Sequence, residues 1–114
     1  MVSARFGKRA RLSNKTDFRK VFEQPKRSAD AYFTVLTRPN ELGFPRLGMV
    51  VSRKSAKTAV ARNRIKRVIR ESFRQHQQGL GNTDFVVIAR ENLEKYDNAI
   101  FFESLKRHWV RLTE

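Results

Sequence analysis

The residues of this sequence best suited to chemistry are cations and aromatic rings. Positions 62 to 70 read Arg-Asn-Arg-Ile-Lys-Arg-Val-Ile-Arg, and Glu71 is the one acid between positions 52 and 74. A guanidinium group makes bidentate contacts with phosphate, lysine adds a mobile point charge, and the amide of Asn63 suits a base edge or a 2′-hydroxyl. The pattern therefore favours a phosphate-binding surface over arginines that only cover their own helix.

Two phenylalanines at helical spacing form a second candidate. Phe18 and Phe22 lie four residues apart, a spacing that is typical of a buried helix face. Exposed aromatic rings, however, stack on the bases of single-stranded RNA, at about 1–3 kcal/mol per base. Phe33, on a neighbouring predicted strand, would complete such a platform. Periodicity alone leaves the core and the stacking interpretations both open.

Residues for protein-borne catalysis are scarce. His76 and His108 each fall in a predicted helix without a carboxylate or a second histidine three or four residues further on, so we interpret both as partly exposed helix residues. The acids are scattered singly, no glycine-rich phosphate loop follows a strand, and cysteine is absent. We therefore predict neither a catalytic site nor a metal site on the protein.

Composition agrees with a polyanion-binding protein. The 114 residues suffice for one domain, and 25 Lys and Arg against 11 Asp and Glu give a net charge of +14. Residues 1–27 and 52–74 carry this excess, whereas 28–51 are neutral and 80–114 are slightly acidic, so the charge is focused for a nucleic acid. No segment reads as a membrane span or a signal peptide, which favours the cytoplasm, and we expect residues 1–12 to form a flexible basic arm.

The first half of the chain predicts one helix and two strands. A helix of two to three turns is expected to begin after an Asn14 cap and to end before Pro25. Residues 31–37 and 46–52 read as strands that pair with each other in antiparallel fashion, joined by a loop over 38–45. A third short strand is expected after them, but residues 53–57 show no clear period.

The second half predicts a helix, a strand and a helix. From Thr58 to about Gln78, apolar positions fall on one face and cations on the other, and Gly79 and Gly81 end the pattern. The apolar face consists of Ala61, Ile65, Val68, Ile69, Ser72 and Phe73. Residues 85–89 read as a strand buried on both faces. Asp97 or Asn98 is expected to cap a last helix whose apolar stripe consists of Phe101, Phe102, Leu105, Trp109 and Leu112. The order predicts an α+β or α/β fold around a small mixed sheet.

The sequence Arg-Asn-Arg-Ile-Lys-Arg at 62–67 resembles the protein subunit of bacterial ribonuclease P, and the resemblance extends over 12–22, 46–54 and 84–90. It implies one α+β RNA-binding domain spanning 1–114, with a mixed four-stranded sheet and three helices in the order αβββαβα. It also implies a left-handed βαβ crossover, although right-handed crossovers dominate in general.

The resemblance further implies a cytoplasmic ribonucleoprotein endonuclease that removes the 5′ leader from precursor tRNA. One protein subunit would bind one catalytic RNA subunit, which holds the magnesium ions and performs the chemistry. By matching position, the residues of the RNA-binding helix would be Arg62, Asn63, Arg64, Lys66, Arg67 and Arg70. Arg53, Lys54 and Arg74 are further candidates for RNA binding. Phe18, Phe22 and Phe33 would line a cleft for the single-stranded leader. Leu36 stands where some members carry tyrosine, so no aromatic contact is expected there.

Three other functions share parts of this pattern. A structural or assembly RNA-binding protein of ribosomal type would carry the same charge blocks but needs no aromatic cleft. A duplex DNA-binding protein would place the basic helix in a major groove. A self-sufficient protein nuclease fits least, because it requires clustered acids or histidines.

Overall fold

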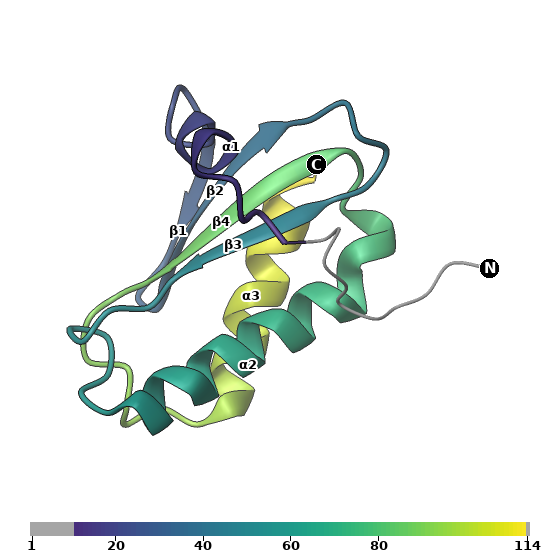
Figure 1. The fold of residues 1–114 in the computed structure, drawn as a ribbon. Helices are drawn as coiled ribbons and strands as arrows, with labels where there is room; N and C mark the ends of the chain where they lie inside the picture. The colour runs from purple at the N-terminus through teal and green to yellow at the C-terminus, as the bar shows by residue number, and fades with distance from the viewer. Residues whose placement is uncertain (1–10, 114) are drawn as a thin grey trace.

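The computed structural model describes residues 11–113, which fold into three helices and a four-stranded sheet (Figure 1). In chain order the elements are α1 (Lys15–Lys20), β1 (Lys26–Ala29), β2 (Phe33–Pro39), β3 (Arg46–Val50), α2 (Ala59–His76), the short 3₁₀ helix η2 (Gln77–Gly79), β4 (Thr83–Ala89) and α3 (Asn98–Leu112). The predicted α+β class and the order αβββαβα are confirmed. Within the described residues, no helix combines the length and the apolar character that crossing a membrane requires.

The strands lie in the order β1-β2-β4-β3, with β3 and β4 parallel and the other pairs antiparallel. The predicted pairing of 31–37 with 46–52 is therefore wrong, because β4 lies between β2 and β3. Residues 85–87 of β4 are fully buried, as the apolar run of this strand predicted, and burial on both faces suits a central strand. The handedness of the connection from β3 through α2 to β4 stays a prediction.

The third strand that was expected after residues 46–52 lies instead before both predicted strands, as β1. β1 has the sequence Lys-Arg-Ser-Ala, of which only Ser28 is buried, so it shows no apolar alternation. It pairs with β2 alone and forms an edge of the sheet. The expected strand near 53–57 is absent, since these described residues form a turn that buries Ser55 and Ala56.

The helices form two layers on the sheet, with α2 and α3 on one face and α1 on the other (Figure 1). The main core lies under α2 and α3, and Ile65, Ile69 and Phe73 are fully buried there, which confirms the predicted apolar stripe of α2. Thr58 caps α2 and Asp97 caps α3 through side-chain oxygens. The apolar stripe of α3 is confirmed at all its positions except Phe102, which is only partly buried.

A second, smaller core lies under α1 and consists of Leu12, Val21, Leu36 and Val86. Asn14 caps α1 as predicted, but the helix has six residues, fewer than the two to three turns expected. At its end, the Arg38 guanidinium donates to the carbonyl oxygen of Lys20 at 2.8 Å. Residues 1–10 of the expected basic arm lie outside the described residues. Leu12 is not part of a flexible arm, since it is buried and its N–H donates to the Leu47 carbonyl at 2.9 Å.

The two histidines have different environments. His76 is partly buried and its Nδ1 lies 2.8 Å from the carbonyl oxygen of Ser72, as expected for a helix residue. His108 is fully buried, so its interpretation as a partly exposed residue is wrong. Its Nδ1 lies 2.7 Å from the Ser28 hydroxyl and its Nε2 lies 3.2 Å from an Asp30 carboxylate oxygen. These partners come from β1 and the following turn, which sequence spacing does not bring together.

This burial predicts that acid destabilises the fold. Burial lowers the pKa of His108 below its ordinary value of 6.5, although Asp30 opposes the shift. Below about pH 6.5 the unfolded chain therefore binds a proton that the folded chain does not bind, and the free energy of unfolding falls as pH decreases, by at most about 1.4 kcal/mol per pH unit. Urea unfolding at about pH 7.5 and about pH 5.5 measures this loss. His108→Gln should lose stability at both values but show a smaller pH dependence. An equal pH dependence in both proteins would contradict this assignment.

Candidate nucleic-acid interface

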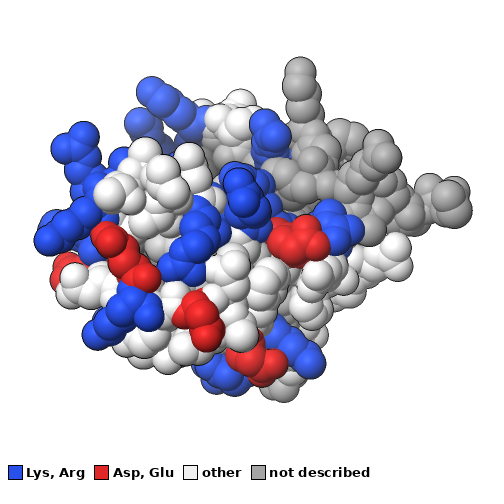
Figure 2. All heavy atoms as spheres, turned by 90° about the horizontal axis from the view of Figure 1, so that it is seen from below, with Lys and Arg blue, Asp and Glu red and all other residues white. Residues whose placement is uncertain are grey.

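The outer face of α2 presents cations that the protein itself does not use. Asn63 and Arg67 are exposed, and Lys66 and Arg70 are partly exposed. Within the part of the chain that the structure describes, Lys66, Arg67 and Arg70 make no ion pair and no side-chain hydrogen bond. Lys and Arg side chains spread across the face seen in Figure 2, with a few acidic side chains between them. These three α2 cations are available to an external anion.

Two other arginines of α2 are turned toward the protein. Arg62 donates to the carbonyl oxygens of residues 56 and 57, both at 3.0 Å. Arg64 donates to the Asn98 side chain at 2.6 Å and to the carbonyl oxygens of Tyr96 at 3.0 Å and Glu94 at 3.3 Å. The Arg64 guanidinium also lies 5.4 Å from the centre of the Phe101 ring. Both arginines flank the apolar stripe of α2, so their side chains reach the neighbouring loops and fasten them.

The remaining cations near α2 differ in their surroundings. Arg74 pairs with Glu71 one turn earlier, and this hydrogen bond lowers the pKa of Glu71. Arg53 and Lys54 are exposed beside a groove between the loop that precedes α2 and the loop that precedes α3. Glu91 and Glu94 line the same groove, so its charge is mixed.

Phe18 and Phe22 form a pair on the other face of the sheet. Their ring centres lie 5.6 Å apart at a tilt of 40°. Phe18 packs against the small core under α1, whereas Phe22 is 46% exposed. A Cβ atom at Gly48 of β3 would lie 2.6 Å from Phe18 Cε2, so the absence of a side chain there allows the ring to rest on the sheet.

Phe33 does not lie with this pair. It is fully buried in the main core, where its ring meets Phe101 of α3 at 5.6 Å between centres. Its predicted place in a leader cleft is wrong, because side chains alternate along β2. Leu36 belongs to the core under α1, so Phe33, three residues earlier, points to the opposite face of the sheet.

A row of open residues lies beside the phenylalanine pair, and sequence reasoning missed it. The register places Ala29, Thr34, Ile88 and Val50 side by side across the four strands. Ala29 and Val50 are exposed, and Thr34 and Ile88 are partly exposed. The neighbouring row, Leu36, Val86 and Gly48, is buried under α1. On the sheet face that carries α1, one end is therefore covered by the helix, whereas the part beyond Phe18 and Phe22 is accessible to solvent.

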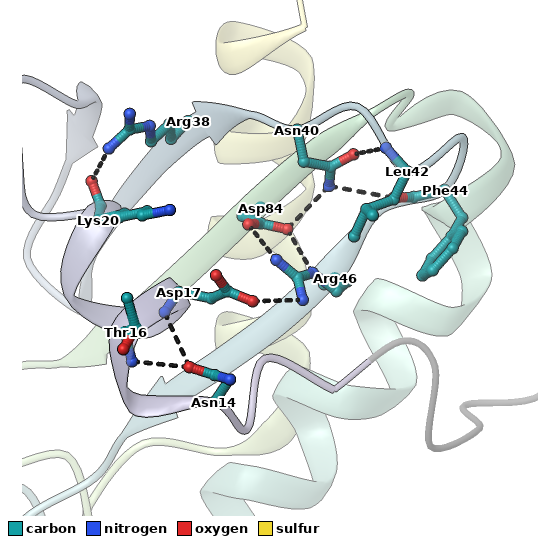
Figure 3. Close-up of polar contacts among 10 residues, drawn as sticks. All are labelled: Asn14, Thr16, Asp17, Lys20, Arg38, Asn40, Leu42, Phe44, Arg46 and Asp84. Carbon is teal, nitrogen blue, oxygen red and sulfur yellow. Dashed lines mark hydrogen bonds and ion pairs between the residues drawn. The ribbon is translucent and has the colours of Figure 1, made fainter.

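Arg46 fastens α1 to the sheet (Figure 3). Its guanidinium donates twice to the Asp84 carboxylate of β4, at 2.7 and 2.8 Å, and once to Asp17 of α1 at 3.1 Å. Asn40 donates to the same Asp84 carboxylate at 2.8 Å. The hydrogen bonds that Arg46 donates to Asp84 raise the pKa of Arg46, against the opposing effect of burial. Sequence reasoning missed this network because its members are far apart along the chain.

Known proteins resemble this chain over nearly its whole length. The sequence model of the family described as Ribonuclease P matches residues 6–113. The ribonuclease P protein component of Methylococcus capsulatus is 48% identical over 108 residues, which cover 95% of this chain and 84% of that protein. The corresponding protein of Pasteurella multocida is 44% identical over 111 residues, 97% of this chain and 93% of that protein.

Solved structures agree with these relatives. The RNase P protein of Staphylococcus aureus superimposes with a TM-score of 0.82 at 33% identity, covering 92% of this chain and 95% of that chain. The RNase P protein of Thermotoga maritima, in complex with 1-(4-fluorophenyl)-2-thiourea, gives a TM-score of 0.80 at 37% identity, with coverage of 89% and 98%.

Fold, basic surface and relatives define the class as the RNA-binding protein components of ribonucleoprotein enzymes. The chain belongs to the ribonuclease P family. It is the accessory subunit of the endoribonuclease that matures the 5′ ends of tRNA, and it pairs with the RNase P RNA. The ribosomal-type alternative is not supported. Ribonuclease P is magnesium-dependent in general, and residues 11–113 bring together no group of three His, Asp or Glu side chains suited to a metal ion.

The close approach of Gly48 and Phe18 predicts the effect of an added methyl group. Gly48→Ala should displace the Phe18 ring and lower the free energy of unfolding by about 1–3 kcal/mol, the usual cost of overpacking. Urea unfolding measures the loss, and the Phe18 ring resonances report the displacement. Gly79→Ala is the matched control, because a Cβ atom there meets no atom within 4 Å. Equal effects of the two substitutions would refute the close packing of Phe18 on β3.

Proposed function

We propose that two opposite surfaces of the chain bind two different RNAs in the ribonuclease P complex. The exposed cations of α2 bind the RNase P RNA, and the open face beside α1 binds the single-stranded 5′ leader of precursor tRNA. The observation that carries this proposal is the division of the sheet, since α2 covers one face and the Phe18–Phe22 pair lies on the other.

The α2 surface suits the phosphates of a large folded RNA. Lys66, Arg67 and Arg70 have no protein partner among the described residues, so a phosphate contact breaks no existing ion pair. Asn63, Arg53 and Lys54 extend this surface as exposed polar or cationic residues. Arg62, Arg64 and Arg74 contribute positive potential while their side chains hold the loops and Glu71.

The open face beside α1 suits an unpaired strand. Phe22 offers a half-exposed ring on which a base can stack, and the ring of Phe18 lies next to it. The row from Ala29 to Val50 continues this apolar surface across the sheet. Mature tRNA has no leader, so contacts on this face favour the precursor over the product.

The chemical step belongs in this proposal to the RNA subunit. Magnesium ions held by that RNA would activate water and stabilise the leaving oxygen at the phosphodiester. The protein acts by binding and by reducing repulsion between phosphates. One α2 surface per chain is consistent with one protein per RNA. We place the complex in the cytoplasm, because the resemblance to bacterial ribonuclease P implies it.

Loss of the free α2 cations should weaken binding in a salt-dependent way. Arg67→Ala together with Arg70→Ala should lower the salt slope of affinity for the RNase P RNA by about 0.7–0.9 for each lost contact. Filter binding over a range of salt concentrations measures this slope. Arg64→Ala is a comparison variant, because its side chain makes three hydrogen bonds to the protein, so its loss should lower the free energy of unfolding rather than remove a phosphate contact. An unchanged slope in the double variant would refute the α2 interface.

Loss of the exposed ring should affect the precursor alone. Phe22→Ala should reduce the affinity of the assembled enzyme for precursor tRNA by about 1–3 kcal/mol, the value of one base–aromatic stack. Affinity for mature tRNA should not change, and the fold should persist because Phe22 is half exposed. Equal losses for both RNAs would exclude a leader contact. Phe22→Trp, which retains a ring, should keep the preference for the precursor.

A further inference from the structure

Cations from three separate segments meet where β1 forms the edge of the sheet. We call this group the β1-edge surface, and all its members are exposed: Lys26, Arg27, Arg90, Lys106, Arg107 and Arg111. The sequence does not show it, because residues 80–114 are slightly acidic as a whole. The fold separates these charges, since Glu91, Glu94 and Asp97 lie in the loop before α3, whereas the cations of α3 lie in its second half.

Direct contacts hold the second half of α3 against β1. Lys26 Nζ donates to the carbonyl oxygen of Leu112 at 3.2 Å, and Arg111 donates to the Ser28 hydroxyl at 3.0 Å. At the turn after β1, Arg90 donates to the carbonyl oxygen of Asp30 at 3.0 Å, and Arg107 lies 3.7 Å from its carboxylate. The guanidinium groups are therefore held in place before any ligand binds, which reduces the entropy lost on binding.

Acids compensate little of this positive charge. The Asp30 carboxylate accepts hydrogen bonds from Ser104 and from the N–H groups of Tyr32 and Phe33, and these outweigh burial and lower its pKa. It is thus one partly buried anion shared by many donors. Among the described residues, Glu103 lies in a shallow hollow with Lys106, Arg107 and the half-exposed Val110. Asp97 and Glu103 also line a neighbouring hollow with Arg107, so part of the positive charge remains uncompensated.

The β1-edge surface continues the open face that carries α1. Arg27 lies opposite Leu36 in the sheet, so it points to the α1 face, whereas Lys26 reaches α3 on the other face. A strand of RNA that leaves the row beside Phe22 at Ala29 therefore meets Arg27 first and the cations of α3 after crossing the edge.

Structural roles account for only part of this surface. Cations on an edge strand prevent pairing with another chain, which explains Lys26 and Arg27. A cation near a helix C-terminus offsets the helix dipole, which explains Arg111. Arg90 and Arg107 also hold the turn at Asp30. None of these roles accounts for Lys106, which makes no ion pair or hydrogen bond among the described residues.

We propose that the precursor's single strand, after leaving the cleft beside Phe22, crosses the β1 edge and binds the β1-edge surface through its phosphates. This inference rests on the proposed leader cleft and extends it from bases close to the cleavage site to RNA further upstream. Phosphate contacts carry no sequence information, so this surface adds affinity that depends on leader length.

The test uses Arg27→Gln combined with Lys106→Gln in the enzyme assembled with RNase P RNA. Neither side chain makes an ion pair or a hydrogen bond within residues 11–113, so the fold should persist, which thermal unfolding checks. Binding is measured for mature tRNA, a precursor whose short leader ends within the cleft, and a precursor with a long leader. The expected result is a loss confined to the long leader, with its salt slope reduced by about 1.4, which is about 0.7 for each of two single-strand contacts.

Arg27→Lys with Lys106→Arg is the matched control, and this charge-retaining pair should bind all three RNAs as the unchanged protein does. Equal losses on the short and the long leader, or no loss on either, would overturn the inference. Phe22→Ala separates the two proposals, because it reports on the short leader. If Phe22→Ala has no effect on binding of the short leader, the proposed leader cleft is refuted. The β1-edge surface is tested separately, by the difference in affinity between the short and the long leader.

Discussion

The partly buried guanidinium of Arg46 makes the contacts on which the α1 side of the molecule depends. It joins β3 to Asp84 of β4 and to Asp17 of α1, and its side chain is only 14% exposed. Removing either acid would leave this charge with less compensation and lower the free energy of unfolding. A six-residue helix is too short to be stable by itself. Arg46, the small core beneath α1 and the open position at Gly48 together fix where Phe18 and Phe22 lie.

In α2, different positions of one helix contribute to the core and to the surface proposed to bind RNA. Its period places five side chains in the core, and the positions that flank this stripe carry Arg62 and Arg64. Those two arginines hold the loops on either side of the groove before α2, so the helix is anchored by part of its own positive charge. The cations furthest from the stripe have no protein partner among the described residues, and we propose that they bind the RNase P RNA. The cations of this helix, which look alike in the sequence, therefore fall into two sets in the structure: those that hold loops and those that are open to a ligand.

Local patterns predicted most of the helices and the central strand. The features that they missed depend on contacts between residues far apart along the chain. The stripe of α2 and the caps at Asn14 and Asp97 depend on near neighbours, and they are confirmed. β1 was missed because an exposed edge strand needs no apolar alternation. Phe33 was assigned to the wrong face because its residue type was weighed without the pairing that sets the strand's orientation. His108 is buried and Arg46 is partly buried, against partners 80 and 38 residues away that spacing along the chain does not reveal.

The arrangement also limits what the protein can contribute to catalysis. A surface that binds the RNase P RNA equally before and after cleavage lowers repulsion throughout the cycle and does not by itself distinguish substrate from product. A surface that binds only the leader does distinguish them, because the product has lost that strand. Placing the two surfaces on opposite faces of one small sheet lets the first hold the enzyme together without competing for the ligand of the second. In the proposed function, selectivity for the precursor depends on α1 and the sheet face beside it, and affinity for the RNase P RNA depends on α2.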